Sequence, residues 1–168
     1  VEELLKRLER PLPIYLHPQA LNRKYLQGQH RLREIGFGLS QEAIEQLGGI
    51  LVYNRKPEQI VPGLWLTGEV PRTVEFETPE PNFFTELEGE VRPDLLPDDQ
   101  AVVLETERGL VLVLGCAHTG MINTLDWVKT FIGKDKIYAV LGGTHLMSAG
   151  QERIEKTAHL LAAYGLER

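Results

Sequence analysis

The sequence QAVVLETERGLVLVLGCAHTG, residues 100–120, decides the fold of this chain. Two apolar runs rich in β-branched residues flank a short turn at Gly109, and this pattern is typical of a β-hairpin. The second run, residues 110–114, is apolar throughout, which predicts a strand buried on both faces of a sheet. The strand ends abruptly at Gly115, and a thiol and an imidazole follow at Cys116 and His118.

A second strand end of the same kind follows further along the chain. Residues 136–141 form another apolar run, and the sequence GGTHL, which contains His145, comes directly after it. Apolar residues at helical spacing over 121–132 separate the two runs, so we expect a parallel strand pair joined by a crossover helix. Because open α/β sheets bind ligands at the carboxyl ends of their strands, we expect both histidines to face one site.

The rest of the chain supplies further helices and strands, and together they predict an α/β fold. The expected helices cover 2–8, 41–47 with Ser40 as N-cap, and 151–164 with Ile154, Ala158, Leu161 and Ala162 on one face; the expected strands cover 12–16, 50–53 and 60–67. A helical turn is expected within 19–25 and a polar loop over 27–38. Residues 71–97 contain five prolines and several acidic residues with little periodicity. This composition predicts one long acidic loop.

Composition limits the function classes that the chain can belong to. Its 168 residues suit a single domain, and the net charge of −6 argues against a nonspecific nucleic-acid binder. No apolar run approaches the ~18 residues that span a bilayer, and the charged N-terminus does not resemble a secretory signal. A single cysteine excludes an internal disulfide and fits a reducing cytoplasm. The partner that we expect is a small-molecule substrate. A homo-oligomer is compatible with it. The chain starts without Met inside a helical pattern, so we expect it to be a piece of a longer protein.

The residues at the two strand ends allow three kinds of chemistry. Thiolate and neutral imidazole are ligands that zinc accepts, and the adjacent glycines let the backbone bend so that Cys116, His118 and His145 converge. Alternatively, Cys116 is a nucleophile activated by His118 and a helix N-terminus. In the third interpretation both strand ends are structural turns, Cys116 is a small buried apolar residue, and the acidic segment 71–97 binds a partner in a noncatalytic interaction module. Spacing alone does not choose among them.

A family resemblance favours the metal site. The run GLVLVLGCAHTGMIN, followed by VLGGTHL and a charged helix, resembles the metallo-β-lactamase-fold hydrolases. Within them it is most similar to the branch named after the dihydropterin-ribofuranosylaminobenzene phosphate synthase of methanopterin biosynthesis. The resemblance is close from the hairpin to the last helix and looser over residues 1–8. It implies the C-terminal half of an αββα sandwich. The superfamily's His-x-His-x-Asp-His signature would lie upstream of Val1, and a final His-Cys-Thr-Gly-type segment would follow Arg168; the chain contains neither.

The resemblance also implies an activity and roles for individual residues. The intact protein would be a metal-dependent hydrolase with two divalent ions, of zinc, iron or manganese, that activates water toward an ester or phosphoester. His118 would be a metal ligand, and His145 would serve a second metal or face the substrate. Cys116 stands where the superfamily often has a bridging Asp or Cys, and the choice between Cys116 and His118 for that role stays open. Without the upstream motif, we expect this chain alone to be inactive or to bind metal weakly.

Overall fold

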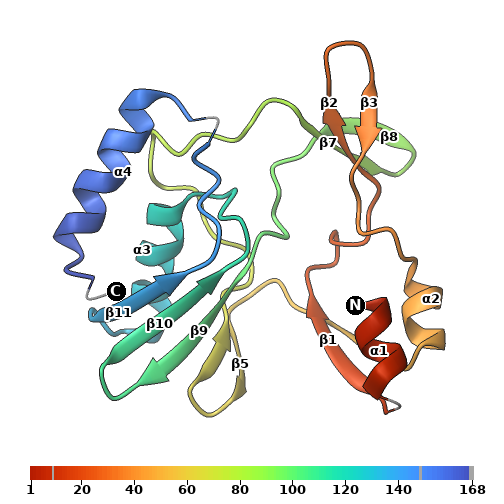
Figure 1. The fold of residues 1–168 in the computed structure, drawn as a ribbon, viewed down its shortest axis with the longest axis horizontal. Helices are drawn as coiled ribbons and strands as arrows, with labels where there is room; N and C mark the ends of the chain where they lie inside the picture. Colours follow the sequence, from red (N-terminus) through yellow and green to blue (C-terminus); the bar gives the residue numbers. More distant parts are fainter. Residues whose placement is uncertain (9, 148, 167–168) are drawn as a thin grey trace. The chain divides into compact units, whose positions relative to one another are not determined.

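The computed structural model describes residues 1–8, 10–147 and 149–166, which divide into two compact units (Figure 1). The first unit consists of residues 1–55 and 81–98, and the second of residues 56–80 and 99–168. The chain therefore passes from the first unit to the second at residue 56, returns to the first at residue 81 and enters the second again at residue 99. The expectation that residues 1–168 fold as one domain stays a prediction.

The second unit is a five-stranded sheet with two helices. Its strands, in spatial order, are β11 (Ile137–Leu141), β10 (Gly109–Leu114), β9 (Ala101–Thr106), β6 (Leu64–Leu66) and β5 (Glu58–Val61). The hairpin of β9 and β10 forms as predicted, and β10 pairs in parallel with β11 through the crossover helix α3 (Met121–Ile132). Helix α4 (Gln151–Ala163) follows β11. The expected strand over 60–67 is instead a second hairpin, which turns at Gly63 with a φ of 79°.

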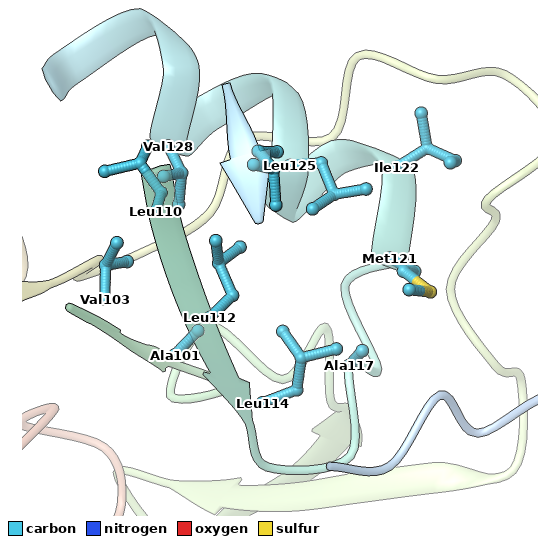
Figure 2. Packing of buried hydrophobic residues seen from close by; sticks show 11 residues of the cluster. Ala101, Val103, Leu110, Leu112, Leu114, Ala117, Met121, Ile122, Leu125 and Val128 are labelled. Carbon is cyan, nitrogen blue, oxygen red and sulfur yellow. The ribbon is translucent and has the colours of Figure 1, made fainter. Parts of the chain in front are cut away.

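One face of this sheet, covered by α3, forms the core of the second unit. Figure 2 shows the side chains of Leu110 and Leu112 on β10 pointing toward Leu125 and Val128 on α3, and all four are fully buried. On the other face of β10, Val113 is 37% exposed. The expectation that β10 is buried on both faces is therefore wrong. The strand alternates between a packed and a partly exposed face, as strands of antiparallel hairpins commonly do.

Helix α4 packs through a face that matches the expected one only in part, because Leu161 contacts the core as expected whereas Ala158 and Ala162 are exposed. Ile154 is 38% exposed, whereas Thr157 is buried and Leu160, Leu161 and Tyr164 contact the core. The packed residues concentrate in the last turns of α4, where the Tyr164 ring lies 5.2 Å from the Lys129 ammonium of α3. Contact with α3 and the core therefore sets the packed face of α4, and apolar spacing along the helix identified only Leu161 of that face.

The first unit contains two smaller sheets and two short helices. Strands β1 (Leu12–Leu16) and β4 (Gly49–Tyr53) pair in parallel, and the helices are α1 (Glu2–Leu8) and α2 (Gln41–Gln46). Ser40 caps α2 as predicted, because its hydroxyl accepts a hydrogen bond from the Ala43 N–H. The second sheet has the order β3 (Leu32–Glu34), β2 (Lys24–Gln27), β7 (Phe83–Leu87) and β8 (Glu90–Pro93).

The four-stranded sheet differs from the expectations for three segments. The segment 71–97 is not one long loop, because it contains the β7–β8 hairpin. Strand β3 lies within 27–38, where a loop was expected, and the turn expected within 19–25 ends before β2 begins at Lys24. Strands β3 and β8 are exposed along their whole length, so they lack an alternating apolar pattern. The sheet is instead fixed by pairing between distant segments and by the buried Lys24 ammonium, which lies 2.8 Å from the Asp94 carboxylate. Among the described residues, no helix has the length and apolar content needed to cross a membrane.

Candidate metal centre

A pair of glycines brings the ends of β10 and β11 together. The Gly143 N–H donates a 2.9 Å hydrogen bond to the Gly115 carbonyl. Gly142 has a φ of 116°, and a Cβ atom there would lie 2.2 Å from the Leu114 carbonyl oxygen. Only glycine fits this backbone conformation and this close approach without strain. The loops after both strands therefore start from one tightly packed junction.

The two predicted histidines meet beyond this junction. The ring centroids of His118 and His145 lie 4.1 Å apart, and both side chains are half-buried. Ala117 and His145 both have positive φ angles, of 54° and 44°. Non-glycine residues seldom adopt this conformation, which costs about 1–3 kcal/mol and is found preferentially at functional sites. The backbone is thus held where it directs the two imidazoles toward each other.

Glu80 is the third member of the group, and the sequence analysis missed it. One carboxylate oxygen lies 3.4 Å from His118 Nδ1, and a carboxylate oxygen lies 3.1 Å from His145 Nε2. One ligand atom from each of the three residues can be chosen so that all three lie within 4.8 Å of one another. Glu80 lies far from both histidines in the sequence and among other acidic residues, so no local spacing distinguishes it.

Arg72 joins the segment that carries Glu80 to the loop that carries His118. Its guanidinium donates hydrogen bonds to the carbonyls of His118 at 3.2 Å, Thr119 at 3.0 Å and Glu77 at 3.3 Å. Burial lowers the pKa of Arg72, while the charges of nearby carboxylates, Glu80 among them, oppose this change. The arginine therefore fixes the backbone on both sides of the site.

Glu77 anchors the same segment to the start of α3. Its side chain is 2% exposed and accepts hydrogen bonds from the N–H groups of Ile122 at 2.9 Å and Asn123 at 2.8 Å. Helix N-termini favour such an acceptor, since their first N–H groups have no partner within the helix. Burial nevertheless raises the pKa of Glu77. A Cβ at Gly120 would lie 2.1 Å from Glu77 Oε2, so the close approach of this carboxylate requires glycine.

Asn123 completes the connection from within α3. Its side-chain oxygen accepts hydrogen bonds from the Thr73 N–H at 2.7 Å and the Val74 N–H at 2.9 Å. Its amide group donates to the Thr119 carbonyl at 2.9 Å. The segment 72–80 is therefore held by side chains, and it brings Glu80 to the histidines without being part of a strand or helix.

The group of Glu80, His118 and His145 has the donor atoms that a divalent cation requires. Two imidazole nitrogens and one carboxylate are a ligand set used by zinc and by non-haem iron. Three protein ligands are also the number typical of catalytic zinc sites, which keep a position for water or substrate. The chemistry and the convergence of these residues thus fit a metal ion.

Cys116 lies outside this group. Within the part of the chain that the structure describes, the potential metal-binding group contains Glu80, His118 and His145, while Cys116 is a free and exposed cysteine. The structural interpretation of Cys116 as a buried apolar residue is wrong for this reason. Its proposed roles as a metal ligand or a nucleophile stay predictions.

Comparison with known proteins identifies relatives along almost the whole chain. No family model matches the sequence. The 7,8-dihydropterin-6-methyl-4-(beta-D-ribofuranosyl)-aminobenzene-5'-phosphate synthase of Methanocaldococcus jannaschii is 31% identical over 98% of this chain and 58% of its own length. The uncharacterized protein MJ0448 of the same organism is 29% identical over 60% of this chain and 36% of its own length.

A solved structure shows the same relationship at the level of the fold. The crystal structure of Tm1679, described as a metal-dependent hydrolase of the beta-lactamase superfamily, matches with a TM-score of 0.81 and 29% identity. The match covers 96% of this chain and 59% of that chain, so the present chain spans less than two thirds of both the synthase and this structure. The expected fold class and the expected resemblance are confirmed: the chain has the fold of the metallo-β-lactamase superfamily, and the archaeal synthase after which the expected branch is named is its homologue.

Proposed function

We propose that this chain carries part of the active site of a metal-dependent hydrolase that acts on an ester or phosphoester of a small molecule. The observation that supports this proposal is the convergence of Glu80, His118 and His145 at the ends of two parallel strands. The description of Tm1679 as a metal-dependent hydrolase supports the same chemistry. The archaeal relative is named a synthase, so we propose only the activation of water by a metal ion at this site and no synthase reaction.

Each residue of the group has a distinct role in this proposal. His118 and His145 offer neutral ring nitrogens as ligands, and Glu80 adds a negative charge that offsets part of the charge of the ion. These three residues would hold a divalent ion, which would supply an activated water and polarise an ester or phosphoryl oxygen. Zinc, iron and manganese all suit these donors, and we propose two such ions in the intact protein. Arg72 and Glu77 keep Glu80 and the His118 loop in position.

Metal titration tests the proposal on the chain as it stands. We expect calorimetry with Zn²⁺, and the visible spectrum with Co²⁺, to show weak binding of one ion to the unmodified chain. His118→Ala removes a ligand, so its affinity should fall by more than about tenfold, because even changes outside the ligand set commonly cost 10–100-fold. His159→Ala is the matched control, since His159 is exposed on α4 and is not part of the group.

The outcomes separate the proposal from its alternative. Absence of Zn²⁺ binding, or equal affinity in the His118→Ala and His159→Ala variants, would contradict a metal centre at these residues. It would favour the interpretation of the strand ends as structural turns. Tight stoichiometric binding that depends on His118 would support the metal centre. It would contradict the separate expectation that this chain alone binds metal weakly.

A further inference from the structure

The peptide group that joins His118 to Thr119 is bound at both of its polar ends by oppositely charged side chains. Its C=O, which belongs to His118, accepts a hydrogen bond from the Arg72 guanidinium at 3.2 Å. Its N–H, which belongs to Thr119, donates to a carboxylate oxygen of Asp99 at 2.9 Å. Hydrogen bonds to ionised groups are roughly twice as strong as neutral ones, so both contacts restrain the orientation of this peptide group.

Asp99 lies beside both ends of the loop that carries His118. One carboxylate oxygen binds the Thr119 N–H, and the other lies 3.9 Å from the position that a Cβ atom would have at Gly115, the first residue after β10. The loop residues between these two contacts therefore curve around the carboxylate. Ala117, in the middle of the loop, is buried and has a φ of 54°. Such an unfavourable backbone conformation persists where the surrounding contacts determine it.

Asp99 also supports Arg72, which binds the other end of the peptide group. Arg72 is half-buried, and it donates to the carbonyls of His118 and Thr119. Burial lowers the pKa of Arg72, and the charge of Asp99 is the largest of the nearby charges that oppose this change. A nearby carboxylate favours the charged form of a cation. Asp99 therefore acts on the His118 loop directly, through the Thr119 N–H, and indirectly, through the charge of Arg72.

We propose that Asp99 is a positioning residue of the candidate metal centre, and that it directs the His118 ring through the peptide group that follows this histidine. Rotation of that peptide group changes the backbone dihedral angles of His118 and with them the direction of its side chain. Among the described residues, Asp99 is not part of the potential ligand group of Glu80, His118 and His145, so it acts on the site through the backbone. This inference rests on the proposed function and deepens it.

The affinity for metal ions and the geometry of the bound ion test this role. We expect Asp99→Ala to lower Zn²⁺ affinity, measured by calorimetry, by about tenfold or more, because changes behind the ligands commonly cost 10–100-fold. The visible spectrum of bound Co²⁺ should change as well, since it reports the arrangement of the ligands. Asp99→Asn keeps an oxygen that can accept from the Thr119 N–H but removes the charge near Arg72. Its Zn²⁺ affinity should therefore lie between those of Asp99→Ala and the unmodified chain.

Asp126→Ala is the matched control for a purely structural effect. Asp126 belongs to the same unit, and its carboxylate also accepts one hydrogen bond, from the Tyr164 hydroxyl, away from the His118 loop. Loss of that bond should lower the thermal unfolding midpoint and leave Zn²⁺ affinity and the Co²⁺ spectrum unchanged. All affinities would be measured well below the unfolding midpoints, so that only folded protein is compared.

A measurement on the metal-free chain separates this inference from the metal centre itself. The His118 and His145 ring centroids lie 4.1 Å apart, so protons of the two rings should give a nuclear Overhauser effect in NMR spectra. This effect should weaken in Asp99→Ala and persist in Asp126→Ala. If it is unchanged in Asp99→Ala, or if Asp99→Ala binds Zn²⁺ as the unmodified chain does, the role of Asp99 is overturned and the metal centre stands. Absence of Zn²⁺ binding to the unmodified chain overturns the metal centre and, with it, the positioning role that rests on it.

Discussion

The loop after β10 and the loop after β11 each present a histidine to the same site, yet they are held in different ways. In the first loop, Ala117, Thr119 and Gly120 are buried. The carbonyls of His118 and Thr119 accept hydrogen bonds from the Arg72 guanidinium. The position of His118 is therefore fixed by a network that extends through the segment 72–80 into α3.

The second loop has much less support around it. None of its described residues, 142–147 and 149–150, is buried. Its backbone is attached to the first loop through the hydrogen bond from Gly143 to Gly115, and the His145 ring is near Glu80. Exposed backbone and few buried contacts are the features of regions that open at low free-energy cost. We infer that the His118 loop is the rigid part of the site and that the glycine junction and Glu80 determine where His145 lies.

Gly142→Ala should have the largest effect, because it disrupts the junction on which the second loop depends. A Cβ atom would lie 2.2 Å from the Leu114 carbonyl, at a φ of 116° that alanine rarely adopts. We expect the free energy of unfolding to fall by about 3 kcal/mol, together with loss of most Zn²⁺ affinity as His145 moves away. Urea unfolding and calorimetry would measure the two quantities.

The matched control for this substitution is Gly150→Ala, at the N-cap of α4. Gly150 has a φ of −65° and no atom within 4 Å of a Cβ built there, so we expect a change of about 1 kcal/mol or less. If both variants were equally stable and bound Zn²⁺ equally well, the second loop would not depend on the glycine junction. The contrast between the two loops would then be wrong.

Glu77→Gln tests the network that holds the first loop. The amide of Gln presents an N–H₂ group where the carboxylate accepts from two backbone N–H groups, so we expect a loss of about 1–3 kcal/mol in the free energy of unfolding at pH 7. Zn²⁺ binding should weaken less than in Gly142→Ala, because Arg72 and Asn123 still support the segment.

The same variant has a defined pH dependence. Because burial raises the pKa of Glu77 above 4.5, the folded state holds this proton more tightly than the unfolded state. The contribution of Glu77 to the free energy of unfolding is then greatest below pH 4.5 and decreases as the pH rises through the raised pKa of its carboxyl group. Gln does not titrate, so the stability difference between the unmodified chain and the variant should narrow from pH 4.5 to pH 7. Urea unfolding between pH 4.5 and pH 7 would measure this stability difference. If the difference widened with pH, the hydrogen bonds from the Ile122 and Asn123 N–H groups would have a larger effect on the pKa of Glu77 than burial has.

The sequence was sufficient to predict features that depend on local pattern. The limits of α3, the hairpin before it and the parallel pairing of its flanking strands are encoded by apolar periodicity and by glycines at the strand ends. The convergence of His118 and His145 follows from this topology, because carboxyl ends of parallel neighbours share an edge of the sheet. The structure places the two rings as expected.

Features that depend on distant contacts could not be predicted in this way. Glu80 reaches the histidines because Arg72, Glu77 and Asn123 hold its segment through hydrogen bonds to another part of the chain, and such bonds leave no periodic signal. The four-stranded sheet was missed for a related reason, since β2 pairs with β7, which lies more than 50 residues further along the chain. Burial of β10 was overestimated because an apolar run alone does not show how many faces are covered.

The smallest effect is expected for Cys116→Ser, which tests the one predicted ligand that lies outside the group. The thiol is exposed, so we expect the free energy of unfolding to change by no more than about 0.5 kcal/mol. Zn²⁺ affinity should stay within about twofold of the affinity of the unmodified chain, because Glu80, His118 and His145 are retained. Changes that disturb a metal site commonly lower the affinity by about 10–100-fold. A tenfold loss in the serine variant would instead show that Cys116 binds the metal, as its position after β10 first suggested. It would also show that the His118 loop rearranges when metal binds, because an exposed thiol outside the group would have to move toward it, and the first loop would then not be the rigid part of the site.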